Sequence, residues 1–368
     1  MTLTNYWWLV IWLFVIAVVT IIIPVTKREY VFGGKESRWR MFPAILLAFP
    51  YVVWAGFRLD NFGDTATYRK IFHEAPGKIS QIPLYLSEHT KDKGFSVLTI
   101  ILKSILGNAD ILFFLIIAIF QIGCIVYVFR KYSSDYWLSF FMFVVSTDYL
   151  SWMYNGIRQF IAVVVTFICF ELILKKRYAP AICIILLAST IHGTALLMLP
   201  IIFIIQGKAW NKKTLFFIFS IMIIMGCIDQ FTPLLDNMLA DTQYSDLVTN
   251  EIWTTDDGTN ILRVLFYSMP TILSLLGKKY IDIADNPMIN LCVNCSCVTM
   301  ALYLLASVSS GIYIGRLPIY TTLQGYIAVP WIIDHMFTTE SAKLVKLGLI
   351  GVFLIFFYFQ MHFAWAMI

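Results

Sequence analysis

Five charged or titratable side chains flank or interrupt long apolar runs, where a charge is costly. They are Arg58, Asp64, Arg158, His192 and Arg316. Because an ionisable group at membrane depth is unfavourable, such residues are the first candidates for function in an apolar chain. A guanidinium binds two phosphate oxygens at once and stays charged at any working pH. The three arginines therefore suggest a site for an anion such as a phosphate.

Arg158 and Gln159 stand at the start of a long apolar run, in the stretch Asn-Gly-Ile-Arg-Gln at 155–159. The start of a helix offers unpaired N–H groups and a favourable dipole to a phosphate. The alternative is that Arg158 only extends its stem along apolar surface to reach the interface. On the first interpretation, Arg158 is a catalytic residue and Gln159 a substrate-binding residue.

Arg316 follows Ser307, Gly311 and Gly315, which are spaced i, i+4, i+8. On one helix, small residues at this spacing allow a second helix to approach closely. Packing alone explains the stripe. The functional hypothesis is that the close packing holds Arg316 against a lipid phosphate.

His192 lies in the polar stretch 190–194, which interrupts an apolar run. A lone histidine on an apolar helix is usually a packing residue. Histidine also titrates near neutral pH and can act as a general base. Both interpretations of His192 stay open from the sequence.

The segment 58–69 is dense in polar residues directly after an apolar run. Asp64 and Tyr68 are four residues apart and would share a helix face. Asp64 could cap a short interfacial helix, or bind a sugar hydroxyl and accept its proton while Tyr68 stacks on the sugar ring. Arg58 and Arg69 are further candidates for substrate binding.

The elements that must position these residues are membrane helices. Hydrophobic residues make up 60% of the chain and charged residues 13%, whereas soluble domains carry about 25% charged residues. Apolar runs long enough to cross a bilayer recur throughout the sequence. We predict an all-α integral membrane protein, one polytopic domain over 1–368. It would have about ten to twelve spanning helices and one or more re-entrant or broken segments.

Loop charges orient these helices, because basic loops stay in the cytoplasm. The basic segment 27–40 is then cytoplasmic. Segments 58–93 and 230–260 become external loops, the second of them acidic. The run 95–106 is too short to span and is predicted to be interfacial or re-entrant. The run 180–205 is either a hairpin entering from the cytoplasm with His192 at its tip, or one broken helix. In this topology all five candidates lie at the external face.

No cofactor or metal is expected. Cys292, Cys295 and Cys297 have a spacing that resembles a metal site, but they lie in an apolar run without a nearby histidine. Buried cysteines in such runs are ordinary packing residues. The net charge of +5 mostly reflects cytoplasmic loops, so no nucleic-acid partner is predicted.

Taken in order, these motifs resemble the EpsG/Wzy-type family of polysaccharide polymerases, which act on O-antigen or exopolysaccharide repeat units. The matching stretches are Gly56–Arg58, Gly63–Asp64, Tyr68–Arg69, Lys93–Phe95, Gly156–Ala162, Leu187–Ala195 and Gly315–Leu317. Lys93 departs from the family, where many relatives have an acidic or proline-containing approach to the Gly-Phe pair, so no role is assigned to it.

The resemblance implies a multi-pass enzyme of the bacterial inner membrane with a GT-C-like architecture. Such an enzyme joins oligosaccharide repeats carried on undecaprenyl diphosphate at the external, periplasmic face. The growing glycan leaves its lipid diphosphate and moves to the non-reducing end of an incoming repeat, without nucleotide sugar or metal. Its partners would be the lipid-linked oligosaccharide and the bilayer, with a chain-length regulator protein and a flippase as further candidates.

This chemistry assigns roles to the candidates. Arg158 and Arg316 would hold the diphosphate, Arg58 would be a third contact, and His192 or Asp64 would be the base. A flippase or transporter for lipid-linked oligosaccharides is one alternative, but it needs its arginines in a central cavity. A membrane acyltransferase acting on a glycan is another and would need a cytoplasmic entry for its acyl donor. A scaffold protein would have no use for clustered arginines.

Overall fold

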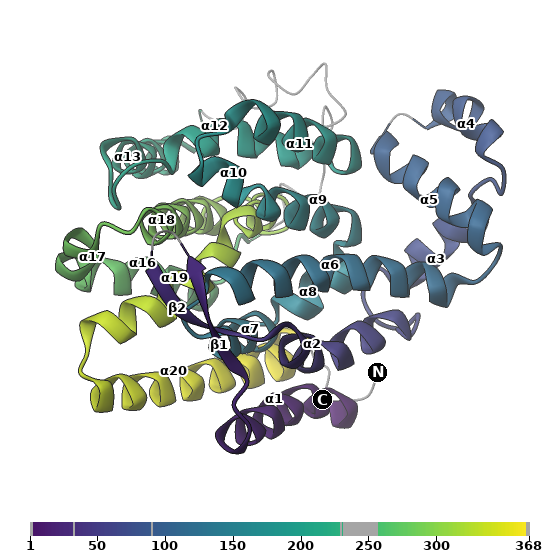
Figure 1. Cartoon of the computed structure of the whole chain (residues 1–368). Helices are drawn as coiled ribbons and strands as arrows, with labels where there is room; N and C mark the ends of the chain where they lie inside the picture. Colours follow the sequence, from purple (N-terminus) through teal and green to yellow (C-terminus); the bar gives the residue numbers. More distant parts are fainter. Residues whose placement is uncertain (1–2, 32–33, 90, 229, 231–256, 366–368) are drawn as a thin grey trace. The chain divides into compact units, whose positions relative to one another are not determined.

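The computed structural model describes residues 3–31, 34–89, 91–228, 230 and 257–365 (Figure 1). These residues form helices, apart from loops and one two-stranded hairpin. They divide into two compact units. Unit 1 comprises 1–172, 178–195 and 333–368, and unit 2 comprises 173–177 and 196–332. The predicted all-α polytopic membrane architecture is confirmed.

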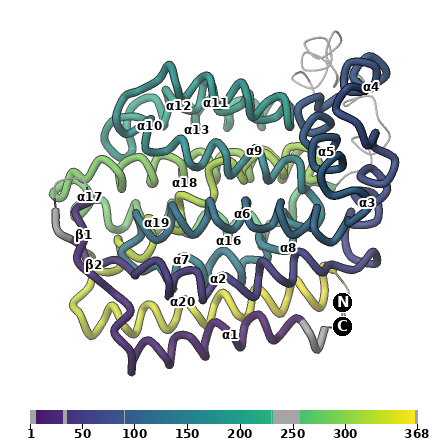
Figure 2. The backbone as a smooth tube through the Cα atoms, turned by 45° about the vertical axis from the view of Figure 1, so that its right-hand side comes forward, coloured from purple at the N-terminus to yellow at the C-terminus, as the bar shows by residue number. Residues whose placement is uncertain are grey.

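Unit 1 contains most of the candidate residues. Its helices are α1 (Leu3–Ile22), α2 (Met41–Gly56), α3 (Thr65–Glu74), η1 (Ile79–Gln81), α4 (Ile82–Glu88), α5 (Lys93–Leu106), α6 (Asp110–Tyr132), α7 (Tyr136–Val145), α8 (Asp148–Asn155), α9 (Ile157–Ile168), α11 (Tyr178–Ile191), α20 (Thr339–Phe359) and the π-turn η4 (Gln360–Ala364). Helices α11, α9, α6, α2 and α1 lie side by side in that order (Figure 2). Helices α3 and α5 pack against one end of this row.

Unit 2 is built around α18 (Pro287–Ser307), against which α13 (Lys212–Gly226) and α16 (Ile261–Leu276) pack. Its other elements are α12 (Met198–Ile204), α17 (Lys278–Ala284), η3 (Ile314–Arg316) and most of α19 (Ile319–Met336). Two short elements, α10 (Phe170–Leu174) and η2 (Gly193–Leu197), cross the boundary between the units.

Within the described residues, four helical segments are long and apolar enough to cross a membrane: Asp110–Tyr132, Ile157–Leu174, Pro287–Ser307 and Thr339–Ala364. The pair α16–α17, bent by 66°, makes a fifth if it counts as one span. Five further apolar helices are shorter, at 10–17 residues. The total of ten to twelve spans therefore stays a prediction.

Polar residues fix where several helices begin. Side chains at the N-caps of α7, α13, α16, α18 and α20 accept hydrogen bonds from the first free N–H groups; they are Asp135, Asn211, Asn260, Asn286 and Thr338. A helix leaves its first N–H groups without intrahelical partners, so these caps stabilise the chosen starting points.

The basic segment 27–40 is more ordered than the sequence suggested. Strands β1 (Thr26–Val31) and β2 (Gly34–Trp39) form an antiparallel hairpin. Arg38, 3% exposed, donates from Nε to the carbonyl of Lys131 at 2.9 Å, and Arg130 pairs with Glu29. The last turn of α6 therefore holds the hairpin through contacts that are distant in sequence.

Of the two predicted external loops, the first lies almost entirely within the described residues and the second almost entirely outside them. The segment 58–93 contains α3, η1 and α4 rather than irregular chain. The predicted acidic loop 230–260 lies outside the described residues, except for 230 and 257–260. Both assignments to the external side stay predictions.

The run 180–205 is broken where the polar stretch predicted. Helix α11 ends at Ile191, and η2 begins at Gly193, leaving His192 at the break. Helix α11 belongs to unit 1 and α12 to unit 2, and η2 between them crosses the boundary. The choice between a hairpin and one broken helix therefore stays open.

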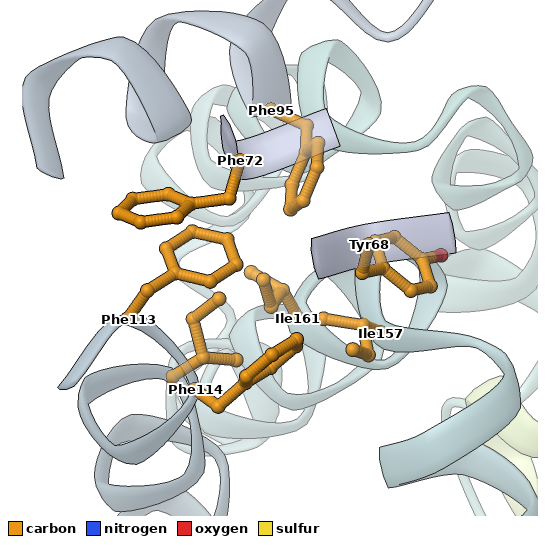
Figure 3. Packing of buried hydrophobic residues seen from close by; sticks show 8 residues of the cluster. Tyr68, Phe72, Phe95, Phe113, Phe114, Ile157 and Ile161 are labelled. Atoms are coloured by element: carbon orange, nitrogen blue, oxygen red, sulfur yellow. The ribbon is translucent and has the colours of Figure 1, made fainter. Parts of the chain in front are cut away.

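An aromatic cluster forms the core of unit 1 at the end where α3 and α5 pack. Its members are Tyr68, Phe72, Phe95, Phe113, Phe114, Ile157 and Ile161 with Ile117, from α3, α5, α6 and α9 (Figure 3). Phe72 stacks on Phe113, with ring centroids 4.5 Å apart. Such rings bury large apolar areas and prefer stacked or edge-on geometries. The cluster fixes the first turns of α3, α5 and α9 relative to one another.

Candidate functional site

Four of the sequence motifs meet at this end of unit 1. Asp64 and Tyr68 lie at the start of α3, and Lys93–Phe95 form the start of α5. Arg158 and Gln159 lie in the first turn of α9, and His192 directly follows the last residue of α11. Tyr68 packs edge-on against Phe95 at 5.9 Å, and both rings belong to the aromatic cluster that includes Ile157 (Figure 3). The motifs are far apart in the chain and become neighbours through helix packing.

Arg158 lies at the centre of this assembly. Its Nη1 is 2.8 Å from the carboxylate of Asp92, and its guanidinium lies 5.9 Å from the ring centres of both Tyr68 and Phe95. Its Nε is buried and has no hydrogen-bond partner. The side chain is 36% exposed. Arg158 thus combines a charge that Asp92 holds in place with a side chain that is partly accessible to an oxyanion.

His192 is held by its neighbours. Thr194 donates its backbone N–H to Nδ1 of His192 at 3.4 Å, and the two side chains are 3.2 Å apart at Thr194 Oγ1 and His192 Nδ1. Gln159, 2% exposed, donates from Nε2 to Thr194 Oγ1 at 3.5 Å. A chain of polar contacts therefore runs from α9 to the histidine, and it involves two residues that the sequence grouped separately.

Gly94 brings α5 into contact with the last turn of α11. A Cβ at this position would lie 2.2 Å from Thr190 Oγ1 and 2.8 Å from the Thr190 carbonyl carbon. Only a glycine leaves room for this approach. The Gly-Phe motif thus sets the distance between α5 and the turn that carries His192.

Asp64 lies at the N-cap position of α3 and is exposed. Its carboxylate makes no capping hydrogen bond, so the capping alternative is wrong. Gly63, in the left-handed region at φ 58°, packs so closely on Asn155 that a Cβ would lie 1.9 Å from its Oδ1. The chain before Asp64 is therefore fixed to the end of α8, and the exposed Asp64 interacts electrostatically with Arg158.

Arg58 is buried, with 3% of its surface exposed. It donates from Nε to the carbonyl of Ala55 at 2.5 Å and from Nη1 to that of Met153 at 2.6 Å. The rings of Phe114 and Tyr154 lie 4.8 Å and 4.5 Å from its guanidinium carbon. Burial lowers its pKa from the ordinary value. These contacts join α2 to α8, and a substrate contact by Arg58 stays a prediction.

Arg69 and Tyr68 are also engaged within the protein. Arg69 pairs with Asp110 and, at 2.6 Å, with Asp60, and it donates to the carbonyl of Arg58 at 3.2 Å. Tyr68 is 5% exposed and belongs to the aromatic cluster. Their predicted contacts with substrate stay predictions.

Arg316 lies in unit 2, in the short turn η3, and is exposed. The helix stripe predicted before it is wrong, because α18 ends at Ser307. Gly311 and Gly315 instead pack on the chain at 258–259, where a Cβ on either would come within 2.8 Å of it. Because Arg316 belongs to the other unit, its grouping with Arg158 stays a prediction.

Sequence reasoning missed Asp92 and Thr194. Asp92 could have been noticed as an acidic residue two positions before Gly94. Thr194 could have been noticed as a hydroxyl residue two positions after His192. Their roles depend on contacts across helices, which spacing alone does not give.

Within the described ranges, no three His, Cys, Asp or Glu side chains converge in a way that could hold a metal ion. Cys292, Cys295 and Cys297 are buried free thiols on α18.

The comparison with known families covers this whole site. The sequence model of the EpsG family matches residues 41–366, which include every candidate residue named above. Searches of curated proteins and of solved structures returned no match. Membership of this family supports a role in polysaccharide polymerisation. The chain is a multi-pass membrane protein that belongs to the EpsG family.

Proposed function

We propose that this protein polymerises oligosaccharide repeats carried on undecaprenyl diphosphate, at the external face of the bacterial inner membrane. The observation that carries the proposal is the proximity of three residues at one end of unit 1: Asp64 interacts electrostatically with Arg158, and Gln159, beside Arg158, is linked through Thr194 to His192. A partly exposed arginine with an unpaired donor suits an anionic lipid diphosphate,. Apolar helices beside it suit the long lipid tail.

The reaction transfers a glycan between two lipid-linked substrates. The bond between the anomeric carbon of the growing glycan and its diphosphate oxygen breaks, and undecaprenyl diphosphate leaves with the electron pair. A hydroxyl oxygen at the non-reducing end of the incoming repeat forms the new bond to that carbon. The hydroxyl proton passes to a base on the protein. No oxidant, metal or nucleotide enters this balance.

The geometry supports distinct roles for the three residues. Arg158 would stabilise the negative charge that grows on the leaving diphosphate. Nδ1 of His192 accepts the Thr194 N–H, so the neutral ring carries its proton on Nε2. His192 would then donate a hydrogen bond to a phosphate oxygen rather than take a proton. The exposed carboxylate of Asp64 is the better base.

The external side is supported by the two ends of α6. Asp110, at its start, pairs with Arg69 near the site, whereas Arg130, at its end, pairs with the basic hairpin. A helix of 23 residues is about 35 Å long, close to the thickness of a bilayer core. If the basic hairpin is cytoplasmic, the site lies at the other face.

The test is a polymerisation assay with purified protein and a lipid-diphosphate-linked repeat unit, resolved on a gel. We expect a ladder of products without added nucleotide or metal. Arg158→Ala should reduce the rate by about 10²–10³-fold, as expected when one donor to a developing charge is lost. Arg28→Ala, which removes an exposed arginine in β1, is the matched control and should leave the rate unchanged.

His192→Ala and Asp64→Asn separate the two proton roles. If Asp64 is the base, Asp64→Asn should nearly abolish polymer formation, whereas His192→Ala should leave a slower but measurable polymerisation. A substrate that is bound but unchanged by the wild-type protein would contradict the polymerase and favour a flippase.

A further inference from the structure

Asp92 stands directly before α5 in an unusual backbone conformation. Its φ of 49° and ψ of 47° are left-handed, which is uncommon for a residue other than glycine. Its carbonyl accepts the N–H groups of Phe95 and Ser96 at 2.9 and 3.2 Å, so it begins the helix. An aspartate there ordinarily caps the helix with its side chain. The Asp92 carboxylate makes no such bond and pairs with Arg158 instead.

The two side chains of this ion pair differ in their exposure to solvent. The Asp92 side chain is 12% exposed and the Arg158 side chain 36%, so the carboxylate is the more buried partner. It contacts Nη1, while Nε has no hydrogen-bond partner. A buried donor without a partner is unfavourable, but Nε itself is inaccessible here, so an oxyanion would approach the exposed part of the Arg158 side chain.

We propose that Asp92 is a positioning residue for Arg158. It holds Nη1 at 2.8 Å, so that the partly exposed guanidinium keeps one orientation toward the diphosphate of the substrate. The rings of Tyr68 and Phe95 restrict the guanidinium further. The inference rests on the proposed role of Arg158 in binding the diphosphate.

Kinetics give the first test, with the lipid-diphosphate-linked repeat as substrate. Asp92→Asn should lower kcat by about 10–100-fold, the effect of misplacing a catalytic group by about 1 Å, with KM near the wild-type value. Asp92→Glu should recover part of the loss. On an Arg158→Lys background, Asp92→Asn should cause little further loss, because the two residues act together. Asp282→Asn, which breaks the exposed pair with Lys278 on α17, is the matched control.

A second test needs no reaction. Phenylglyoxal modifies arginine, and mass spectrometry follows its rate at Arg158 in the full protein. Asp92→Asn should raise that rate severalfold, because the guanidinium is no longer held. Undecaprenyl diphosphate, added as the probe, should slow it in the wild type. Equal melting temperatures of Asp92→Asn and the wild type would exclude general unfolding as the cause.

The kinetic test and the modification test distinguish the proposed polymerase function from the positioning role of Asp92. A wild-type protein that makes no polymer would reject the proposed function, and the modification rate would still decide the role of Asp92. A modification rate unchanged by Asp92→Asn would overturn the positioning role. So would a wild-type kcat in Asp92→Asn, or an equal loss of kcat in the presence and absence of Arg158.

Discussion

The contact at Gly94 gives the sharpest prediction about how the site is built. Gly94→Ala adds one methyl group, whose carbon would lie 2.2 Å from Thr190 Oγ1, 2.9 Å from its Cβ and 2.8 Å from its carbonyl carbon. Carbon atoms in good contact are about 3.5–4.0 Å apart. The threonine hydroxyl can rotate away, but its backbone carbon cannot. Helices α5 and α11 must therefore separate by roughly 1 Å to reach ordinary contact.

Two effects follow from this separation. Overpacking of a well-packed contact costs about 1–3 kcal/mol, so the free energy of unfolding should fall by that amount. His192 is only two residues beyond Thr190, and its own backbone N–H bonds to Ala188 in α11 at 3.0 Å. A shift of about 1 Å at a catalytic group lowers the rate by up to about 10²-fold. We expect the polymerisation rate of Gly94→Ala to fall more than its stability alone explains.

The assay compares thermal unfolding in detergent with polymerisation at a temperature where the variant is folded. Gly123→Ala is the matched control, because Gly123 lies inside α6 and its added Cβ would have no neighbour within 4 Å. That variant should be as stable as the wild type or more stable by up to about 1 kcal/mol, the helix preference of alanine over glycine. If Gly94→Ala melts and polymerises like the wild type, the tight contact between α5 and α11 is wrong.

Two further predictions concern parts away from the site. Asn294 is fully buried, and its side chain forms hydrogen bonds with three backbone groups of the segment 205–210 at 2.9–3.0 Å. Asn294→Ala should lower the free energy of unfolding by about 1–3 kcal/mol for each group left unpaired, and the melting temperature should fall. The pKa of Glu29 is lowered by its hydrogen bond to Lys27 and by Arg130, against the effect of burial. The stability that Glu29 contributes is therefore present above its unfolded pKa and lost as pH falls through its folded pKa. Glu29→Gln should flatten this acid limb of melting temperature against pH.

Long apolar runs predicted the helices well, because a run of this kind has few alternatives in a bilayer. The break at His192 was also predictable, since polar residues and a glycine interrupt the run there. The hairpin at 26–39 was not predictable in the same way. Its contacts come from Arg130 and Lys131 at the end of α6, which no local pattern reveals.

The sequence predicted which residues belong to the candidate site better than it predicted the contacts between them. Arg58 and Arg158 look alike in sequence, each at an end of an apolar run, yet one is buried against backbone carbonyls and the other pairs with Asp92. That difference depends on which helices pack beside them. The stripe before Arg316 failed for a related reason, since regular spacing was taken to mean a helix that in fact ends at Ser307.

Glycines explain how so few polar residues can be brought together in this chain. Two of the motifs carry a glycine directly beside a close contact: Gly63 meets Asn155, and Gly94 meets Thr190. Each allows a close approach that any side chain would prevent. Gly63 directly precedes Asp64, and Gly94 is two residues beyond Asp92, the partner of Arg158. Without water to fill gaps or polar side chains to bridge them, a membrane helix bundle relies on such close packing to fix geometry. The glycines of these motifs are thus as much part of the proposed site as the charged residues they position.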